Sequence, residues 1–238
     1  MLYSLENVRA NIRNRDGKRV FYLSGSDTLT PSARDFLSRE RIQILPAHLA
    51  KPEQYHLTNG AVFTDKPEHY THLRGDTLVP KTHPVIAFRG HMDTLQAELL
   101  LAQLVTPPKI RSHLLEILQL ARNILRWDVL EEPAVVDKLC GLTADQLRSH
   151  SHRPQEFYQQ PHFMPEYTDG GALLQLNKAR CAARTAELAA AHAFTADDGS
   201  CRRPDLMQAL NRMSSMLYIL MIQLKADPSL RAEQKPSN

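Results

Sequence analysis

The spacing of apolar residues divides this chain into a mixed front and a helical back. From Ala87 onward, apolar side chains recur every three or four residues, which is the period of an amphipathic α-helix. Prolines interrupt this pattern, and Thr143-Ala-Asp-Gln has the form of a capping box that opens a shorter helix. Helices joined by short breaks favour a mainly α fold, an antiparallel bundle. Its four long helices are predicted over Ala87–Val105, Ile110–Leu130, Ala172–Phe194 and Pro204–Leu224.

The first 80 residues are polar and rich in turns. Arg19–Ser24 and Arg41–Leu45 alternate like short strands, and between them Thr30 and Pro31 suit the cap and first position of a helix. This predicts a small mixed α/β appendage, a β-α-β unit over about 20–46. Loops are expected from Pro46 to Val79 and from His150 to Gly170. The predicted organisation is a mixed segment with its linker at 1–80, a bundle domain at 81–225 and a flexible tail at 226–238.

Composition narrows the class of protein. A net charge of +3 without a block of lysine or arginine gives no support for nucleic acid as a partner. The three cysteines lack CxxC spacing, and Cys140 and Cys181 are expected to be buried thiols on helices. There is no signal-peptide pattern and no apolar run of membrane-spanning length, so we expect a cytoplasmic protein without membrane contact.

The helix predicted at Ala172–Phe194 carries Arg180, Arg184 and Glu187 on one face. Residues at i, i+4 and i+7 lie above one another along a helix, so the two guanidinium groups are expected to point into the same space. Paired guanidinium forks suit a polyphosphate. A solvated, self-paired surface is the more common explanation of such a face, and both interpretations stay open at this point.

Two further polar residues interrupt apolar helices. Asp93 and Asn211 would each need partners if buried, although Asp93 could reach solvent and Asn211 could fix the packing of the core. The histidines come close to metal-ligand spacing only at His69-x-x-His72 and His150-x-His152. Motifs of P-loop, dinucleotide-binding and α/β-hydrolase proteins do not occur.

Read together, these segments resemble the ATP:cob(I)alamin adenosyltransferases, most closely the ethanolamine-utilisation branch, over roughly residues 28–224. Several blocks match in the right order, which makes the resemblance specific. The matching blocks are Leu29–Leu37, Lys66-Pro67, Thr71–Leu73, Lys81–Arg89 with Asp93, Ile124–Pro133, Gly141-Leu142, Leu147, Ser151-His152 with Pro154, and Arg203–Ser215.

The resemblance implies a five-helix bundle that binds ATP between subunits, in a dimer or trimer. The family pattern A-R-x3-R-x2-E matches Arg180, Arg184 and Glu187, and the family aspartate matches Asp93, which implies an Asp93–Arg180 salt bridge. Arg180, Arg184 and Asp93 are therefore the implied catalytic residues. The implied ATP-binding residues are Lys81, Thr71, Glu187, Asn211 and Arg212, and the implied cobalamin pocket holds Phe163 and Met164, with Trp127 a weaker candidate.

The chain departs from the family at three places. The branch often has a histidine followed by a CCxxC metal cluster; His56 could match the histidine, but the cysteines are absent, so no metal ligands are assigned. Thr71-His-Leu-Arg-Gly-Asp stands where the propanediol-utilisation type has a glycine-rich phosphate loop. Ser215 replaces an aspartate of that type.

The implied activity is transfer of the 5′-deoxyadenosyl group of ATP to Co(I) of cobalamin. It implies Mg²⁺, ATP and cobalamin, an electron-donating reductase and ethanolamine ammonia-lyase as user of the product. The expected location is the cytoplasm or a bacterial microcompartment. Two alternatives stay open: a non-catalytic protein that delivers or senses adenosylcobalamin, and a shell or assembly partner that binds neither substrate.

Overall fold

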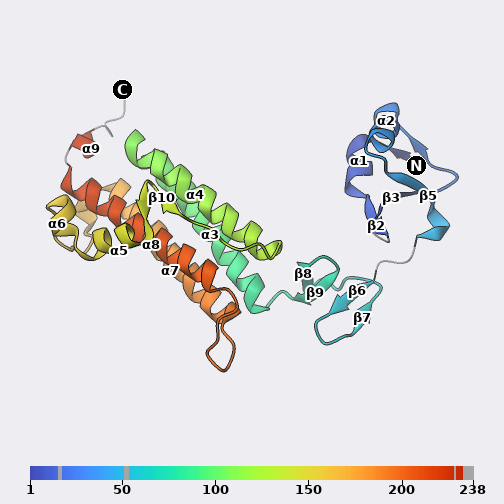
Figure 1. Cartoon of the computed structure of the whole chain (residues 1–238). Helices are drawn as coiled ribbons and strands as arrows, with labels where there is room; N and C mark the ends of the chain where they lie inside the picture. The colour runs from blue at the N-terminus through green and yellow to red at the C-terminus, as the bar shows by residue number, and fades with distance from the viewer. Residues whose placement is uncertain (16–17, 51–53, 228, 233–238) are drawn as a thin grey trace. The chain divides into compact units, whose positions relative to one another are not determined.

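The structure is a computed structural model that describes residues 1–15, 18–50, 54–227 and 229–232. The chain divides into two compact units (Figure 1). Residues 1–55 and 62–65 form the first unit, and residues 56–61 and 66–238 form the second.

The first unit contains the predicted β-α-β arrangement. Strand β3 (Lys18–Leu23) pairs in parallel with β5 (Gln43–Pro46), and α2 (Pro31–Arg39) connects them. Thr30 caps α2 by accepting a hydrogen bond from the Ala33 N–H at 3.3 Å, which confirms the predicted helix start. The other elements are β1 (Leu2–Tyr3), α1 (Leu5–Ala10), β2 (Arg13–Arg15), β4 (Thr28–Leu29) and the 3₁₀ turn η1 (Ala47–Leu49). The hydrophobic core of the first unit consists of Val8, Phe21, Leu29, Ala33, Phe36, Leu37 and Ile42.

Short strands occupy the segment where a loop was predicted, so the prediction of a loop from Pro46 to Val79 is wrong. These strands are β6 (Tyr55–Leu57), β7 (Val62–Phe63), β8 (Tyr70–Arg74) and β9 (Thr77–Pro80). Strand β9 pairs in parallel with β6 and antiparallel with β8. Strands of two to five residues are too short for alternation to reveal them, and the β6–β9 pairing depends on segments far apart in sequence.

Four long helices form the body of the second unit (Figure 1). They are α3 (Pro84–Val105), α4 (Pro108–Val129), α7 (Gly171–Phe194) and α8 (Pro204–Ala226). Helix α3 packs against α4 and α7, and α8 packs against the same two helices, which closes a ring around one core. The shorter α5 (Ala144–His152) packs on α8. The predicted mainly α bundle is confirmed.

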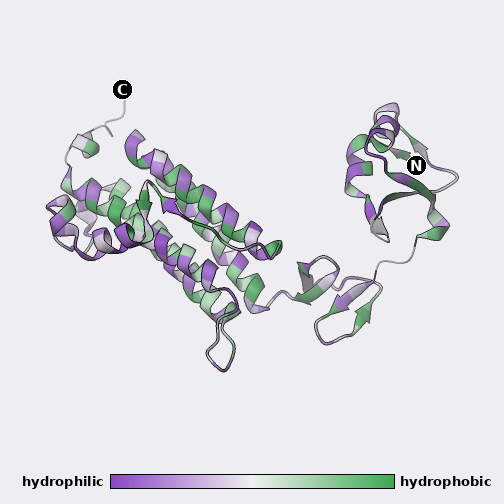
Figure 2. Cartoon of the chain, viewed as in Figure 1, coloured by the Kyte–Doolittle hydropathy of each residue, from purple (hydrophilic) through white to green (hydrophobic). Residues whose placement is uncertain are grey.

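Each bundle helix carries apolar and polar bands along its length (Figure 2). The buried face of α7 consists largely of small residues at helical spacing: Ala179, Ala183, Ala186 and Ala190 are all fully buried. Small side chains let neighbouring helices approach closely. The longer side chains beside this alanine face, among them Arg180 and Glu187, therefore come within reach of α8.

The remaining segments correct two expectations. The stretch from His150 to Gly170 is not a continuous loop, because it includes the end of α5, helix α6 (Pro154–Tyr158) and the 3₁₀ turn η2 (Tyr167–Asp169). Cys140 is not on a helix; it lies with Gly141 in the turn between β10 (Lys138–Leu139) and β11 (Leu142–Thr143). Cys181 is on α7 but exposed.

The C-terminal segment after α8 contains the short helix α9 (Ser229–Ala232). The prediction of a flexible tail at 226–238 falls in part on residues 228 and 233–238, which lie outside the described residues. Within the described ranges, no helix combines the length and hydropathy needed to cross a membrane.

Candidate functional site

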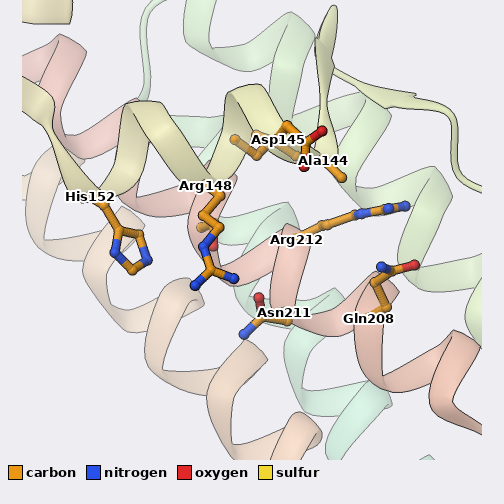
Figure 3. A pocket seen from close by; sticks show the side chains of 9 residues that line it. Ala144, Asp145, Arg148, His152, Gln208, Asn211 and Arg212 are labelled. Atoms are coloured by element: carbon orange, nitrogen blue, oxygen red, sulfur yellow. The ribbon is translucent and has the colours of Figure 1, made fainter.

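A cavity of about 190 Å³ lies between α5 and α8 (Figure 3). Its walls come from two helical faces. Asp145, Arg148 and His152 follow one another along α5, while Gln208, Asn211, Arg212 and Ser215 stand at i, i+3, i+4 and i+7 on α8. The lining is polar, as a site for a charged ligand requires.

Helix α5 is held in place by a capping box at its start and by a buried leucine in its middle. The Thr143 hydroxyl accepts a hydrogen bond from the Gln146 N–H at 3.4 Å, and Gln146 Oε1 accepts one from the Thr143 N–H at 2.9 Å. This capping box confirms the sequence prediction. Leu147 is buried in the bundle core, so the next residue on the helix, Arg148, is directed outward into the cavity.

Arg148 is a site residue that the sequence analysis missed. Figure 3 shows its guanidinium group directed from α5 toward Asn211. Among the described residues, no carboxylate lies within 4.0 Å of this guanidinium, so its charge is not neutralised. The signal available in the sequence was the spacing of Arg148 and His152 on one face of a helix with a clear capping box.

Arg212 supports the wall and does not face the other arginine. Its Nη1 donates to the Val136 carbonyl at 2.6 Å, and its side chain runs away from Arg148 in Figure 3. Arg212 Nε is buried without a hydrogen-bond partner among the described atoms. The predicted ATP contact of Arg212 stays a prediction, and its observed contact fixes the segment that precedes β10.

Asn211 joins this cavity to α7. Its Nδ2 donates to Glu187 Oε1 at 3.1 Å, and Tyr218 on α8 lies beneath the Arg180 guanidinium, whose carbon is 5.9 Å from the ring centre. From the first contact to the second, the residue number falls by seven on α7, from Glu187 to Arg180, and rises by seven on α8, from Asn211 to Tyr218. Such opposite changes are expected for two antiparallel helices. The same register places the exposed Arg184 level with Ser214.

The implied salt bridge between Asp93 and Arg180 is not formed. Arg180 instead donates from Nε and Nη2 to Asn177 Oδ1, at 3.2 and 3.0 Å. On the neighbouring α3, Glu98 rather than Asp93 makes the contacts to α7: it pairs with Lys178 at 2.9 Å and accepts a hydrogen bond from Gln175 at 2.7 Å. Asp93 is exposed at this position.

Lys81 and Thr71 lie in a separate part of the second unit. Lys81 forms an exposed pair with Glu68 at 2.8 Å, and Thr71 pairs with Val79 in the β8–β9 ladder. Neither lines the cavity between α5 and α8. Of the predicted ATP-binding residues, the chain thus brings Asn211, Arg212 and Glu187 together and leaves Lys81 and Thr71 apart.

A second, basic cavity of about 270 Å³ adjoins β8 and the start of α3. It is lined by Arg74, Arg202, Arg203 and His83, among others. Burial, together with the charges of Arg202 and Arg89, lowers the pKa of His83. The neutral ring fits the role of His83 as the cap of α3, because its Nδ1 accepts from the Val85 N–H at 3.2 Å.

A buried carboxylate fixes β8 to the bundle. Asp128 on α4 is fully buried and accepts a hydrogen bond from Arg89 Nε at 2.7 Å, while Arg74 Nη2 lies 3.7 Å away. Arg74 also pairs with Glu131. The sequence analysis did not single out Asp128, because only the fold shows that this aspartate is buried.

The residues predicted for the cobalamin pocket differ in environment. Phe163 packs against the bundle core and lies beside Tyr218, with ring centres 6.3 Å apart. Met164 is 86% exposed. Trp127, on α4, is partly buried against the bundle core and lines a different groove, with Val135 and Val136. Only Phe163 adjoins the Arg180 side of the site.

Metal ligands do not converge within the described residues, where no group of three or more His, Cys, Asp or Glu side chains is placed to hold an ion. His56 Nε2 lies 3.6 Å from Asp76 Oδ2. The ring of His69 packs against that of Tyr70 at a tilt of 59°, and His150 hydrogen-bonds Tyr158 at 2.7 Å, which gives these histidines partners within the fold.

Comparison with known proteins identifies the family to which the chain is similar. The family model for cobalamin adenosyltransferase matches residues 62–224. A corrinoid adenosyltransferase EutT from Salmonella typhimurium (strain LT2) is 30% identical, over 90% of this chain and 89% of its own length. A protein of the same name from Escherichia coli (strain K12) is 29% identical over the same shares.

Among solved structures, a variant of a PduO-type ATP:corrinoid adenosyltransferase from Lactobacillus reuteri, complexed with cobalamin and ATP, is 17% identical with a TM-score of 0.45. The match covers 77% of this chain and 92% of that one. The family model and the EutT relatives confirm the corrinoid adenosyltransferase that the sequence predicted. The chain belongs to the cobalamin adenosyltransferase family.

Proposed function

We propose that this protein is an ATP:cob(I)alamin adenosyltransferase that makes adenosylcobalamin for ethanolamine ammonia-lyase. In the proposed step, Co(I) uses its electron pair to attack the 5′-carbon of ATP. A cobalt–carbon bond forms, the bond from that carbon to the phosphate oxygen breaks, and the electron pair leaves with the polyphosphate. A reductase supplies the electron that converts Co(II) to Co(I).

The reaction needs positioning and charge stabilisation more than proton transfer, since Co(I) is already a strong nucleophile. The observation that carries the proposal is the polar face built from Arg184, Glu187 and Asn211 beside a cavity that holds Arg148. Guanidinium groups without carboxylate partners are suited to the leaving polyphosphate. We assign that role to Arg180 and Arg184, and we add Lys81 as a further cation that would leave its exposed partner Glu68 for the polyphosphate. We assign the nucleoside to Asn211 and the α5–α8 cavity.

Mg²⁺ would arrive with the nucleotide. Magnesium ions in such sites are held by one or two carboxylates together with substrate phosphates, and Glu187 is the carboxylate on this face. The ion would neutralise part of the charge on the polyphosphate. On the corrinoid side, Phe163 would exclude water and a lower ligand from the cobalt, with Met164 at the edge.

The separation of Lys81 and Thr71 from the α7–α8 face motivates a further part of the proposal. We place the complete ATP site between two copies of the chain, one of which supplies the segment of Thr71 and Lys81 and the other Arg180, Arg184 and Asn211. The bundle, residues 81–225, carries the catalytic face. The proposed location is the cytoplasm, with association to a microcompartment.

An absorbance assay tests the proposed function. Protein, ATP, Mg²⁺ and chemically reduced cobalamin are mixed, and formation of photolabile adenosylcobalamin is followed. Arg184→Ala is expected to lower kcat/KM by roughly tenfold to a hundredfold, because it removes a charged hydrogen-bond donor. Arg122→Ala, a matched exposed arginine on α4, is expected to stay within about twofold of the wild type.

Absence of product from the wild type would overturn the enzyme proposal. Cobalamin binding without turnover would favour the alternative of a delivery or sensing protein. Equal rates for Arg184→Ala and Arg122→Ala would remove Arg184 from the site.

A further inference from the structure

Tyr218 on α8 contacts three side chains that come from two other segments of the chain. Its hydroxyl lies 2.9 Å from His162 Nδ1, and the two rings are nearly parallel, with an interplanar angle of 7°. Phe163 stacks beside it at 6.3 Å, and the Arg180 guanidinium lies over its ring at 5.9 Å. A half-buried tyrosine on α8 thus contacts α7 on one side and the segment before η2 on the other.

The hydrogen bonds of His162 fix the direction of the Tyr218 hydroxyl. His162 Nε2 lies 3.1 Å from the backbone carbonyl of His152, and a carbonyl oxygen only accepts, so Nε2 carries the proton. In the neutral ring Nδ1 is then an acceptor, and the Tyr218 hydroxyl donates to it. The segment containing Phe163 is therefore held at His162 on two sides, to α8 by the Tyr218 hydroxyl and to the end of α5 by the His152 carbonyl.

Arg180 is oriented without being neutralised. Asn177 Oδ1 accepts from Nε and Nη2, the Cys181 sulfur lies 4.0 Å from Nη2, and the ring of Tyr218 supports the plane of the guanidinium. Within the described part of the chain, no carboxylate lies within 4.0 Å of this group. Neutral supports hold the fork in place and leave its positive charge, and Nη1, for a ligand oxygen.

We propose that Tyr218 is a positioning residue for both substrates, with its ring orienting Arg180 toward the polyphosphate of ATP and its hydroxyl holding, through His162, the segment that presents Phe163 to the corrinoid. This inference rests on the proposed function and adds to it a residue outside the assigned set. Because Tyr218 contacts both Arg180 and His162, it couples the placement of ATP to the placement of the corrinoid.

Two substitutions at this position separate the two roles. Tyr218→Phe keeps the ring under Arg180 and removes the hydroxyl, so KM for the corrinoid is expected to rise about threefold to tenfold while KM for ATP stays within about twofold. Tyr218→Leu removes the ring as well, so KM for ATP is also expected to rise about threefold to tenfold. Tyr167→Leu, a change at an 88% exposed tyrosine, is the control and is expected to alter neither.

The coupling between Tyr218 and His162 is tested by a double-mutant cycle. His162→Ala is expected to reproduce the effect of Tyr218→Phe, and the double variant is expected to be no worse than either single variant. Additive effects would overturn the link. The positioning role would be overturned if Tyr218→Phe changed the KM for ATP and the KM for the corrinoid equally. It would also be overturned if Tyr218→Leu left both KM values unchanged while its thermal unfolding matched that of the wild type.

The affinities of the variants for the two substrates can also be compared without turnover, by calorimetric titration with ATP and by absorbance titration with cob(II)alamin. If the wild type fails to make adenosylcobalamin, the proposed function fails. The binding constants of Tyr218→Phe and Tyr218→Leu still decide the inference, because it predicts a loss of corrinoid affinity in the first variant and of both affinities in the second.

Discussion

Asp205, in the first turn of α8, is held by partners on two chain segments. Arg203 donates to both of its oxygens, at 3.0 and 2.9 Å, and the Ala134 N–H donates at 2.8 Å. Arg203 in turn bonds the carbonyls of Trp127 and Glu132. Burial opposes ionisation of Asp205, but these hydrogen bonds outweigh it and lower the pKa to about 2.

This shift predicts a pH dependence of stability. Because the folded pKa of Asp205 lies below its ordinary value, the stabilisation is complete above about pH 4 and is lost as the pH falls to about 2. At neutral pH, Asp205→Asn is expected to reduce the free energy of unfolding by about 2 kcal/mol. Urea unfolding between pH 7 and pH 2 should show the gap to the wild type closing on acidification. Asp137→Asn, at an exposed aspartate, should show no such gap.

The cysteines should differ sharply in reactivity. Burial, aided by the charge of Glu116, raises the pKa of Cys140 to about 12, whereas Cys181 is exposed on α7. Since the thiolate is the reactive form, alkylation of Cys140 at pH 8 is expected to be about a hundredfold slower than alkylation of Cys181. Mass spectrometry of peptides after timed treatment with iodoacetamide measures both rates. Comparable rates would contradict the burial of Cys140.

At the scale of elements, the start of α5 is the point where a single residue controls one wall of the cavity. Thr143→Ala removes the cap of the helix that carries Arg148 and His152. The free energy of unfolding is expected to fall by about 1 kcal/mol, as measured by urea unfolding. Thr185→Ala, in the middle of α7, is the matched control and should have little effect, because alanine suits a helix interior. A similar loss in both variants would mean that the cap contributes nothing specific.

The long helices could be predicted from sequence because each has a repeating apolar face and a clear boundary residue. Pro84, Pro108 and Pro204 each stand at a helix start in the structure. The strands from β6 to β9 escaped prediction because their order comes from pairing between segments. Their residues carry too little periodicity to indicate it.

The candidate site was also predictable only in part, because some of its contacts depend on how separate segments pack together. Arg184, Glu187 and Asn211 stood out by motif, and the structure joins the last two directly. The partner of Arg180 could not be read from a motif, because a motif does not show which of several nearby polar side chains an arginine contacts in the folded chain. Asn177, three residues earlier on the same helix, supplied a local partner in place of Asp93.

At the scale of the whole molecule, the proposed site between two copies can be tested by mixing inactive chains. Lys81→Ala and Arg184→Ala are each expected to be nearly inactive alone. In a co-expressed mixture, about a quarter of the sites would combine an intact Lys81 with an intact Arg184 from a neighbouring copy. Recovery of roughly a quarter of wild-type activity is expected. A mixture no more active than the separate variants would place the whole site within one chain.

The hydrogen bond between Asn211 and Glu187 has a consequence for how the nucleotide enters. The bond uses one N–H of Asn211 and one oxygen of Glu187, so a nucleoside that binds that N–H must replace Glu187, whereas the amide oxygen and the second N–H of Asn211 take no part in the bond. The bond acts as an internal competitor that lowers the affinity for ligands offering only one weak contact. In the proposed site, a nucleotide whose polyphosphate also binds the arginines of α7 is expected to displace Glu187 more readily than adenosine alone does.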